Sequence, residues 1–280
     1  MPSWTIDSID WSRFDATRVA PDLVAIVKAA ALVENNGRDY AIYLGNVFAD
    51  DPQFRRVAED WAEEEVQHGA ALGRWAMLAD PHWDFAAAAA RFTAGYRIPL
   101  DAMSSVRGSR TGELIARCMV ETGTSSYYTA LADAAGEPVL AQICRKIAAD
   151  EFRHYKLFYD WMRRYQDRER MGLVARLRVG LGRLVEADDD ELAYAFFAAN
   201  AAPDAVYERR RWSRAYSARA YALYRPSHVA RGVSMALKAI GLPANGRLHA
   251  ALWPLAARLL ARRARAPAAA PGDQNFRYLR

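Results

Sequence analysis

The sequence predicts an almost entirely α-helical protein built on a four-helix bundle. Residues that favour helices, chiefly Ala, Leu, Arg and Glu, dominate the composition. Apolar residues recur at helical spacing, whereas the period-two alternation and hairpin dipeptides of strands are nearly absent. Four long periodic segments are joined by two short turns and one long connection, the order of a bundle whose helices pair two and two.

The first pair of helices is separated by acidic residues and a proline. One helix is expected from about Asp22 to Ala49, with Asp50-Asp51-Pro52 as its breaker. The next begins near Pro52, a residue favoured in a first turn, and stops at Asp80-Pro81. A connection over residues 81–110 follows, with a short Ala-rich helix at residues 85–92, and is long enough to cross the bundle.

The second pair completes the bundle. A third helix is expected from about Thr111 to Ala135, and Gly136-Glu137-Pro138 separates it from a fourth that runs to about Arg168. This order predicts a ferritin-like four-helix bundle over residues 1–169. Helical patterns recur at 171–185, 188–200, 204–223, 226–240 and 247–264, so residues 170–265 are expected to form a basic helical extension packed on the bundle. The acidic run at 188–191 fits a helix N-terminus, and the Ala/Pro/Gly stretch introduces a flexible tail at 266–280.

Composition excludes several classes of protein. At 280 residues, with 52% hydrophobic and 25% charged residues, the chain is folded rather than disordered. No apolar run is long enough to cross a membrane and residues 1–10 lack a signal pattern, so a cytoplasmic location is expected. Cys118 and Cys144 lie in helical apolar patterns and are expected to be buried free thiols.

Charge divides the chain into an acidic and a basic part. Residues 1–160 hold 16 Lys and Arg against 23 Asp and Glu, and residues 161–280 hold 22 against 10. Nucleic acid, anionic lipid and an acidic protein all fit a surface with a net charge of this sign, and so do solvated arginines without a partner. Charge alone does not choose among them.

Six ionisable residues fall on the inward faces of the four long helices. The second and fourth helices each carry a Glu-x-x-His unit, and the first and third each carry one Glu among apolar neighbours. Residues three apart share one helix face, so a carboxylate and an imidazole can bind one metal. Four carboxylates and two imidazoles suit two iron or manganese ions, and without metal the four buried carboxylates would repel one another. This pattern of carboxylate-bridged di-iron bundles predicts the ligands Glu34, Glu65, His68, Glu121, Glu151 and His154.

Each chelating helix carries a further acid next to its metal-binding Glu. Glu64 precedes Glu65 and Asp150 precedes Glu151. Each is expected to accept the outer ring N–H of the His on the opposite helix, fixing its tautomer. The alternative is that Glu63, Glu64 and Asp150 are surface charges.

Two segments resemble the soluble acyl-ACP (acyl-carrier-protein) desaturases. Residues 140–154, LAQICRKIAADEFRH, are similar to the fourth-helix signature of that family, and residues 61–69, WAEEEVQHG, to its second-helix signature. The resemblance spans about residues 20–165 and implies the same six ligands. It also implies that Thr124 lies on the oxygen-binding side of the cluster and that Trp61 and Asp150 form an electron route through His68. Residues 34–37, residues 121–124 and the chain beyond residue 170 depart from the family pattern.

The resemblance implies an O2-dependent desaturase acting on a saturated acyl chain carried as an acyl-carrier-protein or CoA thioester. Its cofactor is two iron ions per chain, its electron donor is of the ferredoxin type, and a homodimer is expected. Acyl carrier protein is acidic, so the basic C-terminal half offers a docking surface. The densest cluster is Arg209, Arg210, Arg211 and Arg214.

Other functions are compatible with the same ligand pattern. The same ligand order serves aldehyde-deformylating oxygenases, N-oxygenases and hydroxylases, and a non-catalytic ferritin-like iron-binding protein is a further alternative. Nucleic-acid binding is not expected, because the arginines are dispersed and few stacking aromatics accompany them in a recognisable motif.

Overall fold

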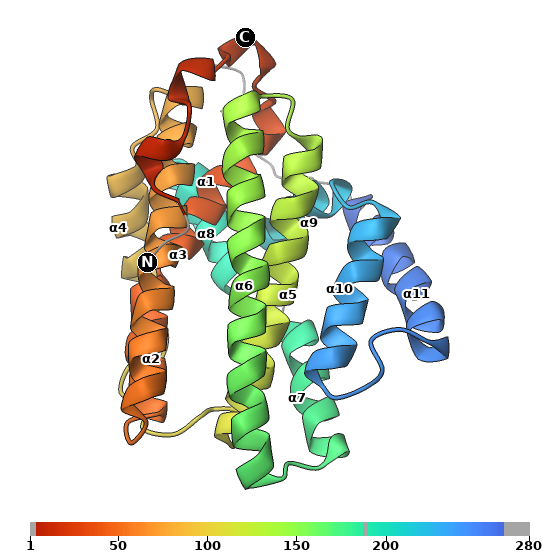
Figure 1. The fold of residues 1–280 in the computed structure, drawn as a ribbon. Helices are drawn as coiled ribbons and strands as arrows, with labels where there is room; N and C mark the ends of the chain where they lie inside the picture. Colours follow the sequence, from red (N-terminus) through yellow and green to blue (C-terminus); the bar gives the residue numbers. More distant parts are fainter. Residues whose placement is uncertain (1–3, 187–189, 266–280) are drawn as a thin grey trace.

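The protein is an all-α, ferritin-like helical bundle (Figure 1). The computed structural model describes residues 4–186 and 190–265, in which there are α-helices and short 3-10 turns but no strand. The bundle comprises α1 (Pro21–Asn35) with α2 (Gly37–Val47), α3 (Pro52–Ala79), α5 (Arg110–Ala134) and α6 (Pro138–Glu169). The predicted fold class is confirmed, and α3, α5 and α6 begin and end within two residues of the predicted bounds.

The predicted first helix is interrupted. Asn36 has backbone angles of −83° and 2° and separates α1 from α2, where one helix to Ala49 was expected. A Cβ atom on Gly37 would lie 2.6 Å from Cβ of Glu65, so the chain passes α3 here at a distance that only glycine allows. The close approach to α3 and the weak helix preference of Asn-Gly explain the break.

Side-chain caps define where the long helices start. The Asp51 carboxylate accepts hydrogen bonds from the backbone N–H groups of Gln53 and Phe54 at the start of α3. Glu137 does the same for Val139 and Leu140 at the start of α6. Glu137 also accepts a 2.7 Å hydrogen bond from Trp75 Nε1, which ties the beginning of α6 to the end of α3.

The connection between the two pairs carries α4 (Phe85–Gly95), three residues longer than predicted. It packs against α8 as well as α1 and α3. A 2.9 Å hydrogen bond closes the C-terminal end of α4, from the backbone N–H of Tyr96 to the carbonyl of Phe92. The connection therefore covers one side of the bundle.

In the described part of the chain five helices follow the bundle, and all but the last of them pack directly on it. They are α7 (Leu173–Glu186), α8 (Asp190–Asn200), α9 (Arg209–Ala222), α10 (Pro226–Ala239) and α11 (Arg247–Ala264). Helix α8 lies against α1, and α7 and α10 lie against α5. Phe196, Phe197 and Trp212 belong to the same apolar cluster as residues of the bundle helices. Helix α9 begins five residues later than predicted, since residues 201–208 are not helical, and Tyr207 in this segment packs on Phe197 of α8.

Two predicted features lie partly or wholly outside the described residues. The predicted tail, residues 266–280, is one of them. Of the acidic run at 188–191, Asp190 and Glu191 form the first turn of α8 as expected, whereas Asp188 and Asp189 are not described. Over the described chain, none of the helices has the length and apolarity needed to cross a bilayer.

Helices α1 and α3 cross at Gly69, which gives a first prediction. A Cβ atom there would lie 2.6 Å from the Asn35 backbone nitrogen and 2.9 Å from the Ala31 carbonyl oxygen. We expect Gly69→Ala to lower the free energy of unfolding by about 1 to 3 kcal/mol, because the helices must separate. Denaturant unfolding of the metal-free protein measures this change. Gly123→Ala on exposed helix surface, where an added Cβ meets nothing within 4 Å, is the matched control and should be neutral or stabilising.

Candidate metal centre

The six residues singled out from the sequence converge in the middle of the bundle. Each long helix contributes: α1 supplies Glu34, α3 supplies Glu65 and His68, α5 supplies Glu121, and α6 supplies Glu151 and His154. None of the six is more than 6% exposed. Helices distant in sequence thus bring four carboxyl groups and two imidazoles together away from water.

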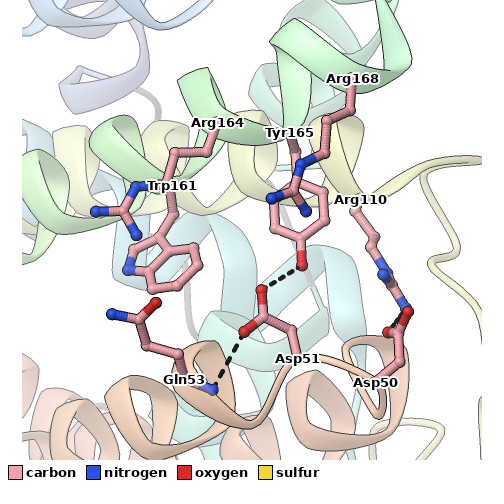
Figure 2. Close-up of a pocket in the computed structure, with 8 residues that line it drawn as sticks. All are labelled: Asp50, Asp51, Gln53, Arg110, Trp161, Arg164, Tyr165 and Arg168. Carbon is pink, nitrogen blue, oxygen red and sulfur yellow. Dashed lines mark hydrogen bonds and ion pairs between the residues drawn. The ribbon is translucent and has the colours of Figure 1, made fainter.

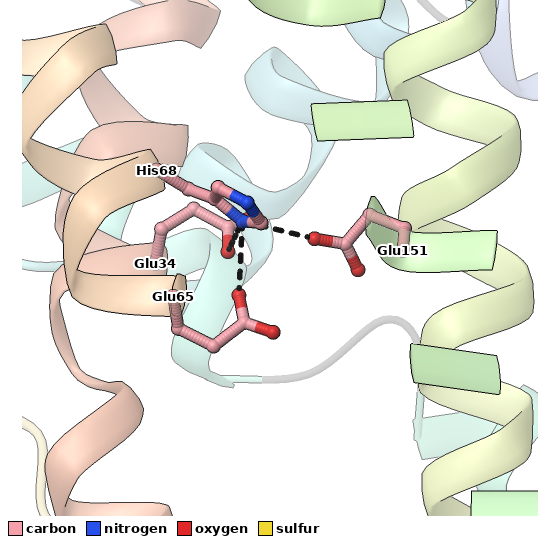
Figure 3. A group of neighbouring side chains, drawn as sticks. All are labelled: Glu34, Glu65, His68 and Glu151. Atoms are coloured by element: carbon pink, nitrogen blue, oxygen red, sulfur yellow. Dashed lines mark ion pairs between the residues drawn. The ribbon is translucent and has the colours of Figure 1, made fainter. Parts of the chain in front are cut away.

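The ligand atoms form two overlapping groups of four. One consists of Glu34, Glu65, His68 and Glu151 (Figure 3), and the other of Glu65, Glu121, Glu151 and His154. Within each group the candidate ligand atoms all lie within 4.8 Å of one another. Glu65 and Glu151 belong to both groups. Two ions bound here would therefore share two carboxylates, and each would have one His and one Glu of its own.

Both imidazoles turn Nδ1 toward the centre. His68 Nδ1 lies 3.4 Å from a Glu65 oxygen, 3.3 Å from a Glu151 oxygen and 3.9 Å from a Glu34 oxygen. His154 Nδ1 lies 3.1 Å from a Glu65 oxygen and 3.9 Å from a Glu121 oxygen. The inner nitrogens thus face the carboxylates that would bind the same ion.

Several of these buried atoms have no hydrogen-bond partner. They are both ring Nδ1 atoms, both carboxyl oxygens of Glu121 and Oε1 of Glu151. A buried polar atom without a partner costs free energy, and such atoms are rare in folded proteins. Because the orphaned atoms belong to one hard oxygen and nitrogen donor set, the residues fit a pair of divalent iron or manganese ions.

Proton affinities in the centre are strongly shifted. Burial, followed by the neighbouring Glu65 carboxylate, raises the pKa of Glu34 well above its ordinary value, and burial beside Glu151 does the same for Glu121. Burial alone would lower the pKa of His154, but the Glu64 carboxylate at Nε2 and the Glu65 carboxylate close to Nδ1 raise it to about 9. The pKa of His68 is raised in the same way by Asp150, Glu151 and Glu65. Protons thus offset the clustered negative charge when metal does not.

The apolar core is divided at the level of the six residues. On α3, buried apolar residues 54–62 belong to one cluster and 71–76 to another, with Glu65 and His68 between them. On α6 the clusters hold residues 139–147 and 155–165, on either side of Glu151 and His154. The centre is therefore closed by apolar side chains along the bundle axis in both directions, which excludes water and strengthens the electrostatic interactions inside.

The outer nitrogens of both imidazoles meet the acids that precede the opposite Glu. His68 Nε2 lies 3.1 Å from Asp150, and His154 Nε2 lies 2.7 Å from Glu64. Arg153 donates to both acids and links them. Glu64 and Asp150 are buried, so the alternative that they are surface charges is wrong for these two, whereas Glu63 is exposed. The pairing expected from sequence is present and holds each ring with Nδ1 inward.

Trp61 lies next to His154 rather than His68, and its place in an electron route stays a prediction. Its indole lies against the His154 ring, with centroids 6.4 Å apart, and its N–H has no hydrogen-bond partner. Trp4 instead donates a 2.7 Å hydrogen bond to Asp150 and stacks on His68 at 5.9 Å. The chain before α1 runs back across the bundle through short 3-10 turns, two of which contact α3 and α6, and this course brings Trp4 to α6. Helical periodicity in the sequence does not predict a contact between this segment and α6.

Two hydroxyl groups on α5 contact the centre. Thr124 donates to Glu151 at 2.5 Å, so the residue implied by the resemblance does touch the cluster. Tyr128, one turn further along, donates to Glu34. Its position seven residues after Glu121 puts it on the same face of α5, but this spacing does not specify a partner on α1.

A polar pocket is lined by residues other than the six (Figure 2). Its volume is about 270 Å³, and the start of α3, the start of α5 and the C-terminal half of α6 line it. Its two acids are already engaged: Asp50 pairs with Arg110, and Asp51 caps α3 and accepts a 2.7 Å hydrogen bond from Tyr165. The pocket thus presents ion pairs and caps rather than a ligand set for metal.

Comparison with known protein families matches one part of the chain. A family model described as Rubrerythrin matches residues 114–211, from α5 to α9. That segment includes Glu121, Glu151 and His154. No curated protein matches the chain. The match and the buried cluster together are compatible with a di-iron site.

The acids behind the imidazoles give a second prediction. We expect Glu64→Gln to weaken metal binding about 10- to 100-fold, because a neutral amide holds the His154 ring less firmly and makes it a poorer donor. Competition for Fe²⁺ or Mn²⁺ with a chromophoric chelator measures the affinity. Glu63→Gln, one position away on the exposed face of α3, is the matched control. Equal affinities in the two variants would mean that Glu64 does not support the metal.

The raised pKa values give a third prediction. A group whose pKa is higher in the folded state stabilises it at low pH, and this contribution is lost as pH rises through the folded value. The metal-free protein should therefore lose on the order of 3 kcal/mol of stability from His154 alone as pH rises through about 9. Thermal unfolding measured at pH values below and above 9 gives this loss of stability. In the metal-loaded protein the ions replace the protons, so a parallel decline there would contradict this account.

Proposed function

We propose that this protein is an O2-dependent di-iron oxidoreductase that desaturates an acyl chain carried as an acyl-carrier-protein thioester. The observation that carries the proposal is the pair of overlapping four-ligand groups sharing Glu65 and Glu151. The resemblance of residues 61–69 and 140–154 to the acyl-ACP desaturases supports the choice of substrate.

The six residues would hold two iron ions, Fe²⁺ or Fe³⁺, per chain. Glu34 and His68 would help to hold one ion, Glu121 and His154 the other, and Glu65 and Glu151 are close enough to contribute to both. Iron bound in this way supplies one-electron redox steps and O2 activation, with electrons from a ferredoxin-type donor.

The protein's own part in the reaction is exclusion of water and placement of protons. Apolar clusters close the centre along the bundle axis, so a reactive species formed there is shielded from solvent. The Thr124 hydroxyl on Glu151 holds a proton beside the cluster, and the Tyr128 hydroxyl holds one on Glu34. Met119 and Phe158 in one cluster and Leu131 in the other are buried side chains against which an acyl chain can be positioned.

Product analysis is the deciding experiment and our fourth prediction. Iron-loaded protein is incubated with O2, a ferredoxin reducing system and a mixture of saturated acyl-carrier-protein thioesters, and the acyl chains are analysed by mass spectrometry. We expect a loss of two hydrogens at unchanged chain length. His154→Ala, which removes one ligand and leaves its partners' charges uncompensated, should bind less iron and give no product.

Other products would redirect the assignment. Loss of one carbon would identify an aldehyde-deformylating enzyme, and an added oxygen would identify a hydroxylase or N-oxygenase. An unchanged acyl pool with iron bound would exclude the acyl thioesters tested as substrates and favour another oxidative substrate or a non-catalytic iron-binding role.

Docking of the carrier protein is our fifth prediction. Arg209, Arg210 and Arg214 on α9 are exposed, whereas Arg211 is half-buried and stacks on Trp212. We expect Arg210→Glu with Arg214→Glu to raise KM for acyl-ACP at least about tenfold at low salt, because acyl carrier protein is acidic. The matched control is Arg55→Glu with Arg56→Glu on exposed α3. An equal effect of both pairs would place docking elsewhere.

The expected homodimer is tested by sedimentation of the metal-loaded protein.

A further inference from the structure

Helix α11 presents a row of leucines to solvent. Leu248, Leu252, Leu255 and Leu259 are 43%, 37%, 56% and 51% exposed. Spacings of four, three and four residues place them on one helix face. None of the residues of α11 is fully buried. The helix lies at the outer edge of the molecule (Figure 1) and contacts α9 and α10 with its other side, where His249 lies 2.9 Å from the Ala230 carbonyl oxygen.

Positive charge accompanies this leucine row. Residues 209–265 contain 13 Lys and Arg and no Asp or Glu. On α11 itself, Arg258 and Arg262 are exposed and follow Leu255 and Leu259 by three positions, so they border the row. An exposed apolar stripe with cationic borders and no acid is the pattern of a helix that lies in the plane of an anionic lipid surface.

We propose that α11 binds the surface of anionic lipid bilayers, with the leucine row in the acyl–headgroup boundary and the bordering arginines on lipid phosphates. The helix lies on the membrane and does not cross it, in agreement with the finding that no described helix has the apolarity of a span. Association of this kind is independent of the metal centre.

Two other partners match the charge and apolarity of the α11 surface less well. A second copy meeting α11 across a two-fold axis would set two cationic helix faces together, with no acid on either helix to pair with the arginines. An acidic protein would pair with the arginines, but the row of leucines requires an apolar partner as well. Only an anionic bilayer supplies negative charge and hydrocarbon at one flat surface.

Vesicle co-sedimentation of the full chain tests the proposal. We expect the protein to sediment with vesicles of phosphatidylcholine mixed with phosphatidylglycerol and to remain in solution with phosphatidylcholine alone. Leu252→Asn with Leu255→Asn should lower partitioning about tenfold or more, because the apolar anchor is lost. Arg258→Gln with Arg262→Gln should lower it about fivefold for each arginine near the surface, and added salt should do the same to the wild type.

A matched pair controls for the loss of exposed apolar side chains in general. Ile42 on α2 and Met77 on α3 are 51% and 40% exposed, and Ile42→Asn with Met77→Asn should leave partitioning unchanged. Circular dichroism melts are the check that the variants are folded. We expect them to be, because the replaced side chains face solvent. Equal sedimentation of the leucine pair and the wild type would overturn the proposal.

Two further outcomes would replace the proposed occupant. If the leucine pair converts a dimer to a monomer and no vesicle composition is bound, the surface is an interface between two copies. If the leucine pair abolishes acyl-carrier-protein binding and vesicles are not bound, the surface belongs to that partner. Vesicle binding by the metal-free protein with no acyl oxidation would leave the lipid proposal standing and defeat the proposed function alone.

Discussion

Four carboxyl groups and two imidazoles enclosed in the apolar middle of the bundle constrain everything around them. An unpaired buried charge costs several kcal/mol, so each of the six must face a metal, a proton or a hydrogen-bond donor. Helices α1, α3, α5 and α6 each contribute to the group, which leaves each helix one acceptable register. The apolar clusters end at this level, and Gly37 and Gly69 let neighbouring helices approach closely there. The helix packing is therefore arranged around the centre as much as around the hydrophobic core.

Paired charges behind the imidazoles connect the six residues to other parts of the chain. Glu64 and Asp150 hold the two rings, and Arg153 joins the acids across α3 and α6. Trp4 then connects Asp150 to the N-terminal segment, so residues before the bundle help to orient His68. Acids raise the proton affinity of both rings, and the same contacts make them stronger metal donors once the protons leave. The same imidazoles and acids therefore bind protons when metal is absent and support metal binding once the protons leave.

The chain separates its charges by place. The bundle half is acidic and turns several carboxylates inward, whereas the helices after residue 170 place arginines on the outside. This division leaves arginines exposed on α9, where we propose that an acidic carrier protein docks, and on α11, where we propose that an anionic lipid surface binds. The two surfaces lie on adjacent helices, since α9 and α11 are in contact. Carrier docking and membrane association are therefore proposed for neighbouring parts of one basic face.

The sequence by itself determined the helices and the six-residue pattern, because helical periodicity and the spacing of Glu-x-x-His are local properties of the chain. It also predicted the acids behind the rings, since Glu64 and Asp150 adjoin Glu65 and Glu151 on the same helices. The break at Asn36, which depends on how closely Gly37 passes α3, and the hydrogen bond from Trp4 to Asp150 became known only from the folded structure. Trp4 and Asp150 are 146 residues apart, and no periodic signal along the chain encodes which loop returns to a helix. Contacts within a helix follow from local geometry, whereas contacts between a terminal segment and the core follow from the packing of the whole chain.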